Sequence, residues 1–122
     1  MSGKGFEGLL AYQKAFAAAM EIFEMTKGFP KEEKYSLIDQ IRRSSRSVCA
    51  NIAEAYRKRA YHKHFFSKLT DADAECSETI VWLDFALSSK YIDNELNSKV
   101  KKAYQEIGKL IGYMMQNPEK FK

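Results

Sequence analysis

The sequence has few of the residues that break helices, cross-link chains or bind metals. Among 122 residues there are two prolines, two cysteines, two histidines and one tryptophan. Scarce proline permits long helices. A chain of this length also buries enough apolar surface to fold without a disulfide or a structural metal. We therefore expect residues 1–122 to form one domain.

The sequence also lacks an export signal and a membrane span. The first residues, MSGKGFEGLL, contain no long apolar run, and no stretch approaches the ~18 apolar residues of a transmembrane helix. Cys49 and Cys76 fall within amphipathic patterns, where a free thiol acts as a small buried hydrophobe. We expect a cytoplasmic, reducing setting with no membrane partner, and a disulfide between the two cysteines is the alternative.

The residue patterns of common enzyme sites are missing as well. A di-metal centre in a helical bundle uses Glu-x-x-His motifs, but no Glu lies three residues before His62 or His64. Ser44, Ser45 and Ser47 have no neighbouring histidine and no nucleophile elbow. No glycine-rich phosphate loop is present. The sequence therefore predicts that the protein is not an enzyme and has no metal and no cofactor.

What the sequence does contain is helical periodicity. Apolar residues recur at steps of three and four in four segments, whereas the strict alternation of strands is absent. Helices are predicted at about 7–26 and 31–59, from Tyr61 or His62 to about 88–90, and from about Asp93 to Asn117-Pro118. Asp93 or Asn94 is expected to cap the last helix. The connections are short, so consecutive helices should be antiparallel. The predicted fold is all-α, an up-down-up-down antiparallel four-helix bundle.

The periodicity also predicts which faces are buried. The apolar stripe of the third helix is interrupted by Asp73. If Asp73 is buried it needs a basic partner from the second helix, and if the stripe is rotated it is exposed. The stripe expected in the first helix consists of Leu9, Tyr12, Phe16, Ala19 and Phe23. The stripe expected in the third consists of Phe66, Leu69, Asp73, Cys76, Ile80, Leu83 and Leu87, with Phe65, Ala72, Thr79 and Ala86 beside it.

Charge is distributed unevenly along the chain. From Arg42 to Lys63 there are seven Lys or Arg residues and one acid, Glu54, whereas from Thr70 to Ser89 there are five acids and no Lys or Arg. Arginine clusters bind phosphate backbones through forked donors, and a solvated face or a subunit contact with an acidic partner is the alternative. The candidate nucleic-acid contacts are Arg42, Arg43, Arg46, Arg57, Lys58, Arg59 and Lys63.

A second group of residues is predicted to contact another helix or another subunit. A polar Asn51 within a helix either bonds to its own helix or specifies such a contact. Glu54 is expected to pair with Arg57 or Lys58 on the same face. Seven Tyr, eight Phe and Trp82 exceed what a four-helix core readily hides, which favours self-association over a merely thicker core. The candidate contact residues are Asn51, Glu54, Asp73 and Trp82.

Several motifs, taken together, resemble a known family. They are Phe6-x-x-Leu9-x-x-Tyr12-Gln13-Lys14-Ala15, Phe29-Pro30-x-x-Glu33-x-Tyr35-x-Leu37-x-x-Gln40-Ile41-Arg42-Arg43-Ser44, Ser47-Val48-x-x-Asn51-Ile52-Ala53-Glu54, and Glu75, Glu78-Thr79 and Trp82-Leu83. This pattern resembles the small four-helix-bundle proteins encoded in intervening sequences of bacterial 23S rRNA genes. One departure is Ala55, where the family often has glycine.

The resemblance implies a bundle that assembles into a ring, expected to be a homopentamer. Relatives include the accessory variability determinant protein of diversity-generating retroelements, a basic pentameric barrel that binds nucleic acid and a reverse transcriptase. The family has no established enzymatic activity. The resemblance thus favours a non-enzymatic, homo-oligomeric scaffold whose partners are RNA or DNA, and a reverse transcriptase or another protein. The alternative is a protein-interaction or structural module that does not bind nucleic acid directly.

Overall fold

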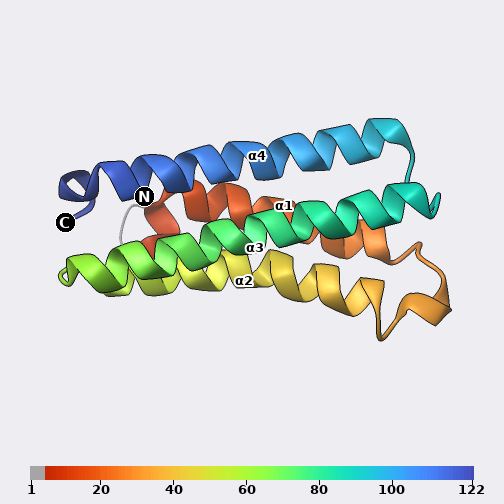
Figure 1. Ribbon diagram of the computed structural model, residues 1–122, viewed down its shortest axis with the longest axis horizontal. Coiled ribbons are helices and arrows are strands. Elements are labelled where there is room, and N and C mark those ends of the chain that lie inside the picture. The colour runs from red at the N-terminus through yellow and green to blue at the C-terminus, as the bar shows by residue number, and fades with distance from the viewer. Residues whose placement is uncertain (1–4) are drawn as a thin grey trace.

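Four amphipathic segments of the sequence form four long helices in the computed structural model, which describes residues 5–122 (Figure 1). Every residue in this range is helical, in a turn or in a short connection, and none is in a strand. The helices are α1 (Leu10–Thr26), α2 (Leu37–Arg57), α3 (His62–Ser88) and α4 (Asn94–Gln116). There are also three short 3-10 helices. Of these, η1 (Phe6–Gly8) precedes α1, η2 (Lys31–Glu33) precedes α2, and η3 (Pro118–Phe121) follows α4.

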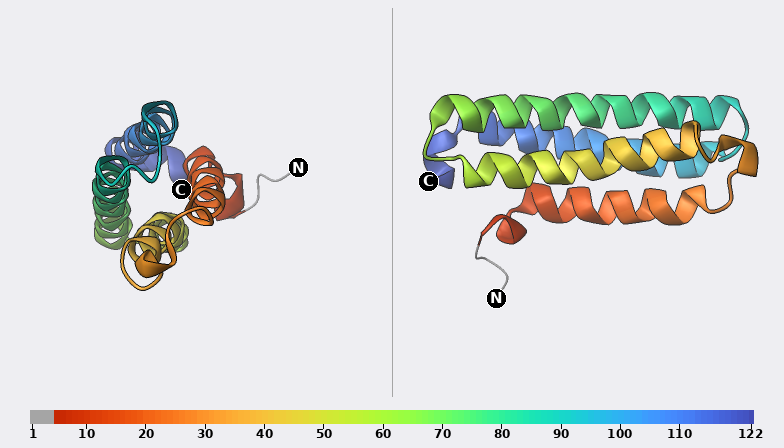
Figure 2. Two further views of the ribbon diagram at one scale, coloured as in Figure 1. Left: turned by 90° about the vertical axis from the view of Figure 1, so that its right-hand side faces the viewer. Right: turned by 90° about the horizontal axis from the view of Figure 1, so that it is seen from below.

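The helices alternate in direction and form a four-helix bundle (Figure 2). Each helix packs against the next along the chain, and contacts between α1 and α4 close the bundle. The turn between α2 and α3 lies at the same end of the bundle as the C-terminus (Figure 1). The predicted all-α, antiparallel four-helix fold is confirmed.

The second helix begins later than its periodicity indicated. Residues 31–33 form the separate turn η2, and Ser36 adopts a non-helical conformation with φ −124° and ψ −100°. The Glu33 carboxylate accepts hydrogen bonds from the Ser36 hydroxyl and from the backbone N–H of Leu37. These bonds satisfy donors at the start of α2, so the helix begins at Leu37 and not at Lys31.

The α1–α2 and α3–α4 connections, at the end of the bundle opposite to the α2–α3 turn, contact each other. The Tyr91 hydroxyl donates to Glu33 Oε2 over 2.8 Å, and the Tyr91 ring lies 5.3 Å from the ring of the buried Phe29. After this turn Asp93, one of the two expected caps, caps α4 by accepting a 2.8 Å bond from the backbone N–H of Leu96. The Phe29-Pro30 and Glu33 elements of the sequence motif therefore fix how α1–α2 and α3–α4 meet.

The buried face of α1 differs from the predicted stripe. Of the predicted stripe only Ala19 is buried, and Phe16 is 52% exposed. Small side chains let α1 lie close to its neighbours, whereas a row of aromatic rings would hold it away. The residues that α1 buries are Ala11, Ala15, Ala18, Ala19, Ile22 and Thr26.

The buried face of α3 is also rotated from the predicted stripe. Phe66 and Asp73 are exposed, while Leu69, Cys76 and Leu83 are buried as expected. Because Asp73 is exposed, its carboxylate does not need a cationic partner in the core. The residues that α3 buries are Phe65, Leu69, Ala72, Cys76, Thr79, Leu83 and Ala86.

Small polar residues let α2 and α3 approach closely. Ser44 and Ser45 are fully buried, and Ser44 Oγ lies 2.8 Å from Thr79 Oγ1 on α3. Each hydroxyl also bonds to a backbone carbonyl of its own helix. These serines therefore pack as small core residues with their hydrogen bonds made.

Candidate nucleic-acid interface

The seven residues predicted to contact phosphate fall into two separate groups, one in α2 and one around the α2–α3 turn. Arg42, Arg43 and Arg46 lie in the first half of the helix. The other four lie where α2 ends and α3 begins. The two groups differ in what surrounds their charges.

Arg42 is engaged within the bundle. Its Nε donates to Thr26 Oγ1 over 2.8 Å, and its Nη2 donates to the backbone oxygen of Phe23 over 3.3 Å. The guanidinium carbon also lies 4.6 Å from the centre of the Phe23 ring. Arg42 thus binds the C-terminal turn of α1, where a cation complements unpaired carbonyls. Its forked donors are largely used inside the chain.

Arg43 and Arg46 are exposed. The guanidinium carbon of Arg46 lies 5.9 Å from the Phe23 ring centre. Neither arginine has a hydrogen bond or an ion pair to another side chain in the described part of the chain. Their charges are free to meet an anion or a carboxylate of another molecule.

The second group forms a cationic surface at one end of the bundle. Arg57 and Arg59, together with Ala60 and the C-terminal Lys122, line an open hollow of about 570 Å³. Lys58 and Lys63 are exposed on the same short segment of chain. We call this surface the basic end; it consists of Arg57, Lys58, Arg59, Lys63 and Lys122.

Lys122 was absent from the predicted site, although the topology explains its position. An even number of alternating helices returns the C-terminus to the end where α2 joins α3 (Figure 1). Lys122 therefore lies beside the α2–α3 turn, far from it in sequence. The sequence could have indicated Lys122 only if the predicted up-down-up-down order of the helices had been combined with the position of this lysine at the end of the chain.

Two interactions arrange the charges of the basic end. Arg59 Nη1 donates to the backbone oxygen of Tyr56 over 2.8 Å, and its guanidinium carbon lies 3.9 Å from the Tyr56 ring centre. Glu54 forms a 2.9 Å ion pair with Lys68 of α3, and not with Arg57 or Lys58 as predicted. Within α2, the acid nearest to the basic end is Glu54, and it is thus paired with a cation outside that surface.

The candidate contact residues have mixed surroundings. Asn51 bonds to the backbone oxygen and the hydroxyl of Ser47, within its own helix. Exposed Asp73 has a carboxylate oxygen next to Gly108 of α4. Trp82 is half-buried and donates to Glu78 Oε2 over 3.2 Å. The side-chain hydrogen bonds of Asn51 therefore stay within its own helix, whereas part of the Trp82 ring remains accessible to a partner.

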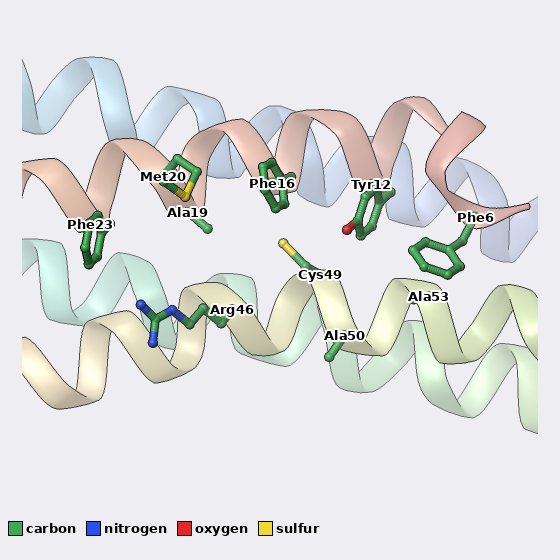
Figure 3. A pocket seen from close by; sticks show the side chains of 10 residues that line it. All are labelled: Phe6, Tyr12, Phe16, Ala19, Met20, Phe23, Arg46, Cys49, Ala50 and Ala53. Atoms are coloured by element: carbon green, nitrogen blue, oxygen red, sulfur yellow. The ribbon is translucent and has the colours of Figure 1, made fainter. Parts of the chain in front are cut away.

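A second concave surface lies between α1 and α2 (Figure 3). This apolar groove has a volume of about 400 Å³, and Figure 3 shows the side chains that line it, which come from η1, α1 and α2. Burial raises the pKa of the Cys49 thiol in the groove to about 11, so the thiol is protonated at neutral pH. The groove is lined by Phe6, Tyr12, Phe16, Ala19, Met20, Phe23, Arg46, Cys49, Ala50 and Ala53.

Two further properties of the described residues bear on the site. Within residues 5–122, no three His, Cys, Asp or Glu side chains come together as ligands for a metal ion. None of the described helices is both long and apolar enough to cross a bilayer.

Comparison with known proteins places this architecture in a family. The sequence matches the family described as 23S rRNA-intervening sequence protein over residues 7–113. The chain belongs to this family. It is also similar to a protein of unknown function from the S23 ribosomal protein family of Bacteroides thetaiotaomicron, known from a crystal structure. The two share 30% sequence identity and a TM-score of 0.80, over 88% of this chain and 96% of the other. None of the curated proteins matches the sequence.

The structure gives physical roles to the residues by which the sequence resembled the 23S rRNA-intervening sequence proteins. Phe29 and Glu33 join the two connections at one end, and Arg42 ties α2 to α1. Ile52 is fully buried, and Asn51 bonds within its helix. Ala55 is fully buried too, so the family's frequent glycine is replaced here by a methyl group that the core accommodates.

Proposed function

We propose that this 23S rRNA-intervening sequence protein is a non-enzymatic, self-associating scaffold that binds nucleic acid through the basic end. The observation that carries the proposal is the convergence of Arg57, Arg59 and Lys122 around one open hollow. Lys58 and Lys63 add charge at the same end. Guanidinium and ammonium groups at such a site bind phosphate oxygens and release counterions from the nucleic acid.

The residues of the basic end recognise the backbone of a nucleic acid and not its sequence. Lysine and arginine contacts to phosphate fix position but carry no base information. Exposed Tyr61, in the same α2–α3 turn, offers an aromatic ring on which an unpaired base can stack. Single-stranded RNA or DNA therefore suits the surface, with weak sequence preference.

The two arginine groups have different roles in this proposal. Arg42 is left out, because its donors are directed at Thr26 and Phe23. Arg46 lines the apolar groove and Arg43 lies in the first half of α2, so neither is at the basic end. Only part of the predicted basic set is therefore proposed to contact phosphate.

A salt titration tests the proposal. If four or five cations each neutralise one phosphate, the slope of log K against log salt is about −3 for single strands and about −4 for duplex. Replacing Arg57 and Lys58 by Gln should make the slope shallower by about 1.4 for single strands. Fluorescence anisotropy of labelled RNA and DNA oligonucleotides between low and moderate salt measures both slopes.

The matched control removes two charges elsewhere. Lys102 and Lys109 are exposed on α4, so replacing both by Gln makes the same change in net charge. This variant should retain the wild-type slope. Equal effects of the two double variants would show that binding follows net charge alone. Failure to bind RNA and DNA even at low salt would contradict the proposal.

The alternative function is a protein-interaction or structural module. The observation that favours it is the large number of exposed apolar side chains outside the basic end, among them Phe16, Met20 and Phe85. Such residues are typical of protein interfaces. A protein that assembles but retains no nucleic acid would support this module.

A further inference from the structure

Two apolar surfaces of the bundle have no partner among residues 5–122. The first is the apolar groove between α1 and α2, where Phe16 is 52% and Met20 is 45% exposed. The second is on α3. We call it the α3 outer face; its exposed residues are Phe66, Thr70, Ala74, Ser77, Val81 and Phe85, with half-buried Glu78 and Trp82 beside them.

The charges at the two surfaces are opposite. The groove is bordered by Arg46, whose guanidinium has no carboxylate partner among the described residues. The α3 outer face carries Glu78, and no Lys or Arg occurs in the sequence from Thr70 to Ser89. Complementary charge of this kind orients a partner and disfavours wrong pairings.

The sizes of the side chains are also complementary. Large rings and Met20 line the α1 side of the groove, while Ala50 and Ala53 provide a low α2 side. The middle of the α3 outer face presents the small residues Thr70, Ala74 and Ser77. A helix with small residues at its centre can approach the protruding rings of α1 closely.

The internal contacts of the bundle show which residues lie at equal heights along its axis. On α2 and α3, Ser44 meets Thr79 and Glu54 meets Lys68, so Arg46 lies near the height of Glu78. On α1, Phe23 lies beside Arg42 and Arg46. Counting back along α1 at about 1.5 Å per residue places Phe16 and Met20 near the height of Ala74.

We propose that the apolar groove of one copy of this chain receives the α3 outer face of a second copy, with Arg46 opposite Glu78. The inference rests on the self-association in the proposed function and names the surfaces that carry it. If two copies are related by rotation about an axis parallel to the bundle axis, residues at the same height along that axis face each other across the contact. Arg46 then faces Glu78, while Phe16 and Met20 surround Ala74.

This contact joins two different surfaces, so it is heterologous. After one contact has formed, one copy still has its α3 outer face free and the other still has its groove free, so successive contacts close into a ring or continue as a filament. In a closed ring all copies point the same way. Their basic ends then gather on one rim.

Charge exchange tests the contact. Arg46→Glu and Glu78→Arg should each weaken association by more than about a hundredfold, because like charges then face each other. The double variant R46E/E78R should restore assembly. Native mass spectrometry and light scattering over a concentration series measure the assembly, and circular dichroism verifies that each variant is folded.

Lys102→Glu is the matched control, because it reverses an exposed charge on α4, away from both surfaces. It should assemble like the wild-type protein. If the wild-type chain assembles while R46E and E78R assemble equally well, the proposed contact is overturned and self-association stands. If each single variant is monomeric and the double variant remains so, the pairing of Arg46 with Glu78 is overturned. A wild-type chain that is monomeric at every concentration would overturn the self-association itself.

Discussion

Arg42→Ala tests whether this arginine belongs to the fold or to the nucleic-acid surface. The substitution removes the bonds to Thr26 Oγ1 and to the Phe23 carbonyl together with the contact on the Phe23 ring. Hydrogen bonds involving a charged group contribute about 1.5–3 kcal/mol, and an exposed cation–π contact about 0.5–1 kcal/mol. Because one guanidinium makes all three contacts, we expect a net loss of about 2–3 kcal/mol.

A double-mutant cycle isolates the bond to Thr26. Thr26→Val removes the acceptor while keeping the shape of a buried side chain that is 1% exposed. The R42A and T26V effects on the free energy of unfolding should not add, and the coupling should be about 1 kcal/mol. Urea denaturation at one fixed protein concentration, followed by circular dichroism, provides the four values.

The same variant separates the two possible roles of the charge. If Arg42 serves the fold, R42A lowers stability while the salt slope of nucleic-acid binding stays unchanged at a temperature where the variant is folded. Arg42→Lys should recover part of the stability, because an ammonium retains the charge but not the fork. A stability within about 0.5 kcal/mol of wild type, combined with a shallower salt slope, would refute the reasoning.

Four further predictions follow from the core and the proposed contact. Burial raises the pKa of Cys76 to about 12 and that of Cys49 to about 11, so both thiols should react slowly with iodoacetamide at pH 8. The pKa of each thiol is higher in the folded than in the unfolded state, so the stability that the protonated thiols contribute should be complete below about pH 8.5 and should decline as pH rises from there towards 12. Urea midpoints measured across this range test the prediction, and a midpoint that rises with pH would contradict it. Ser44→Leu should destabilise by about 1–3 kcal/mol through overpacking against α3 and Ser44→Ala by less, measured by thermal unfolding; the reverse order would contradict close α2–α3 packing. Phe85→Glu, far from the basic end, should weaken nucleic-acid binding by about a hundredfold by abolishing assembly, measured by anisotropy, and unchanged affinity would argue against shared binding by several copies.

The sequence was sufficient for the number and order of the helices. Period 3.6 without strand alternation indicated four helices, and the cap of α4 is Asp93, one of the two residues that the sequence offered. The start of α2 was predicted too early, because the bonds of Glu33 to Ser36 and Leu37 involve side chains that periodicity does not weigh.

The faces of the helices were harder to predict. In α1 the larger apolar residues were assigned to the core, but Ala15 and Ala18 are buried while Phe16 remains exposed. Packing distance between helices decides this choice, and the periodicity of one helix does not report it. An α1 that is apolar on both sides is itself a sign of a second partner.

The candidate site was predicted in part for the same reason. The sequence indicated a cluster of cations on α2, but the contact of Arg42 with Thr26 joins residues 16 positions apart. The contribution of Lys122 to the basic end joins residues even further apart. Both depend on tertiary packing, so charge density along the chain could not divide the arginines between the fold and the surface.

Ultraviolet crosslinking of the full chain to uniformly labelled single-stranded RNA and DNA, with the crosslinked peptides identified by mass spectrometry, tests the central claim most directly. The account predicts crosslinks concentrated at Tyr56 near the end of α2, at Tyr61 in the α2–α3 turn, and in the C-terminal segment around Phe121, and their loss when Arg57 and Lys58 are replaced by Gln. Crosslinks along α1 at Phe16 and Phe23, with none at the α2–α3 turn, would contradict it.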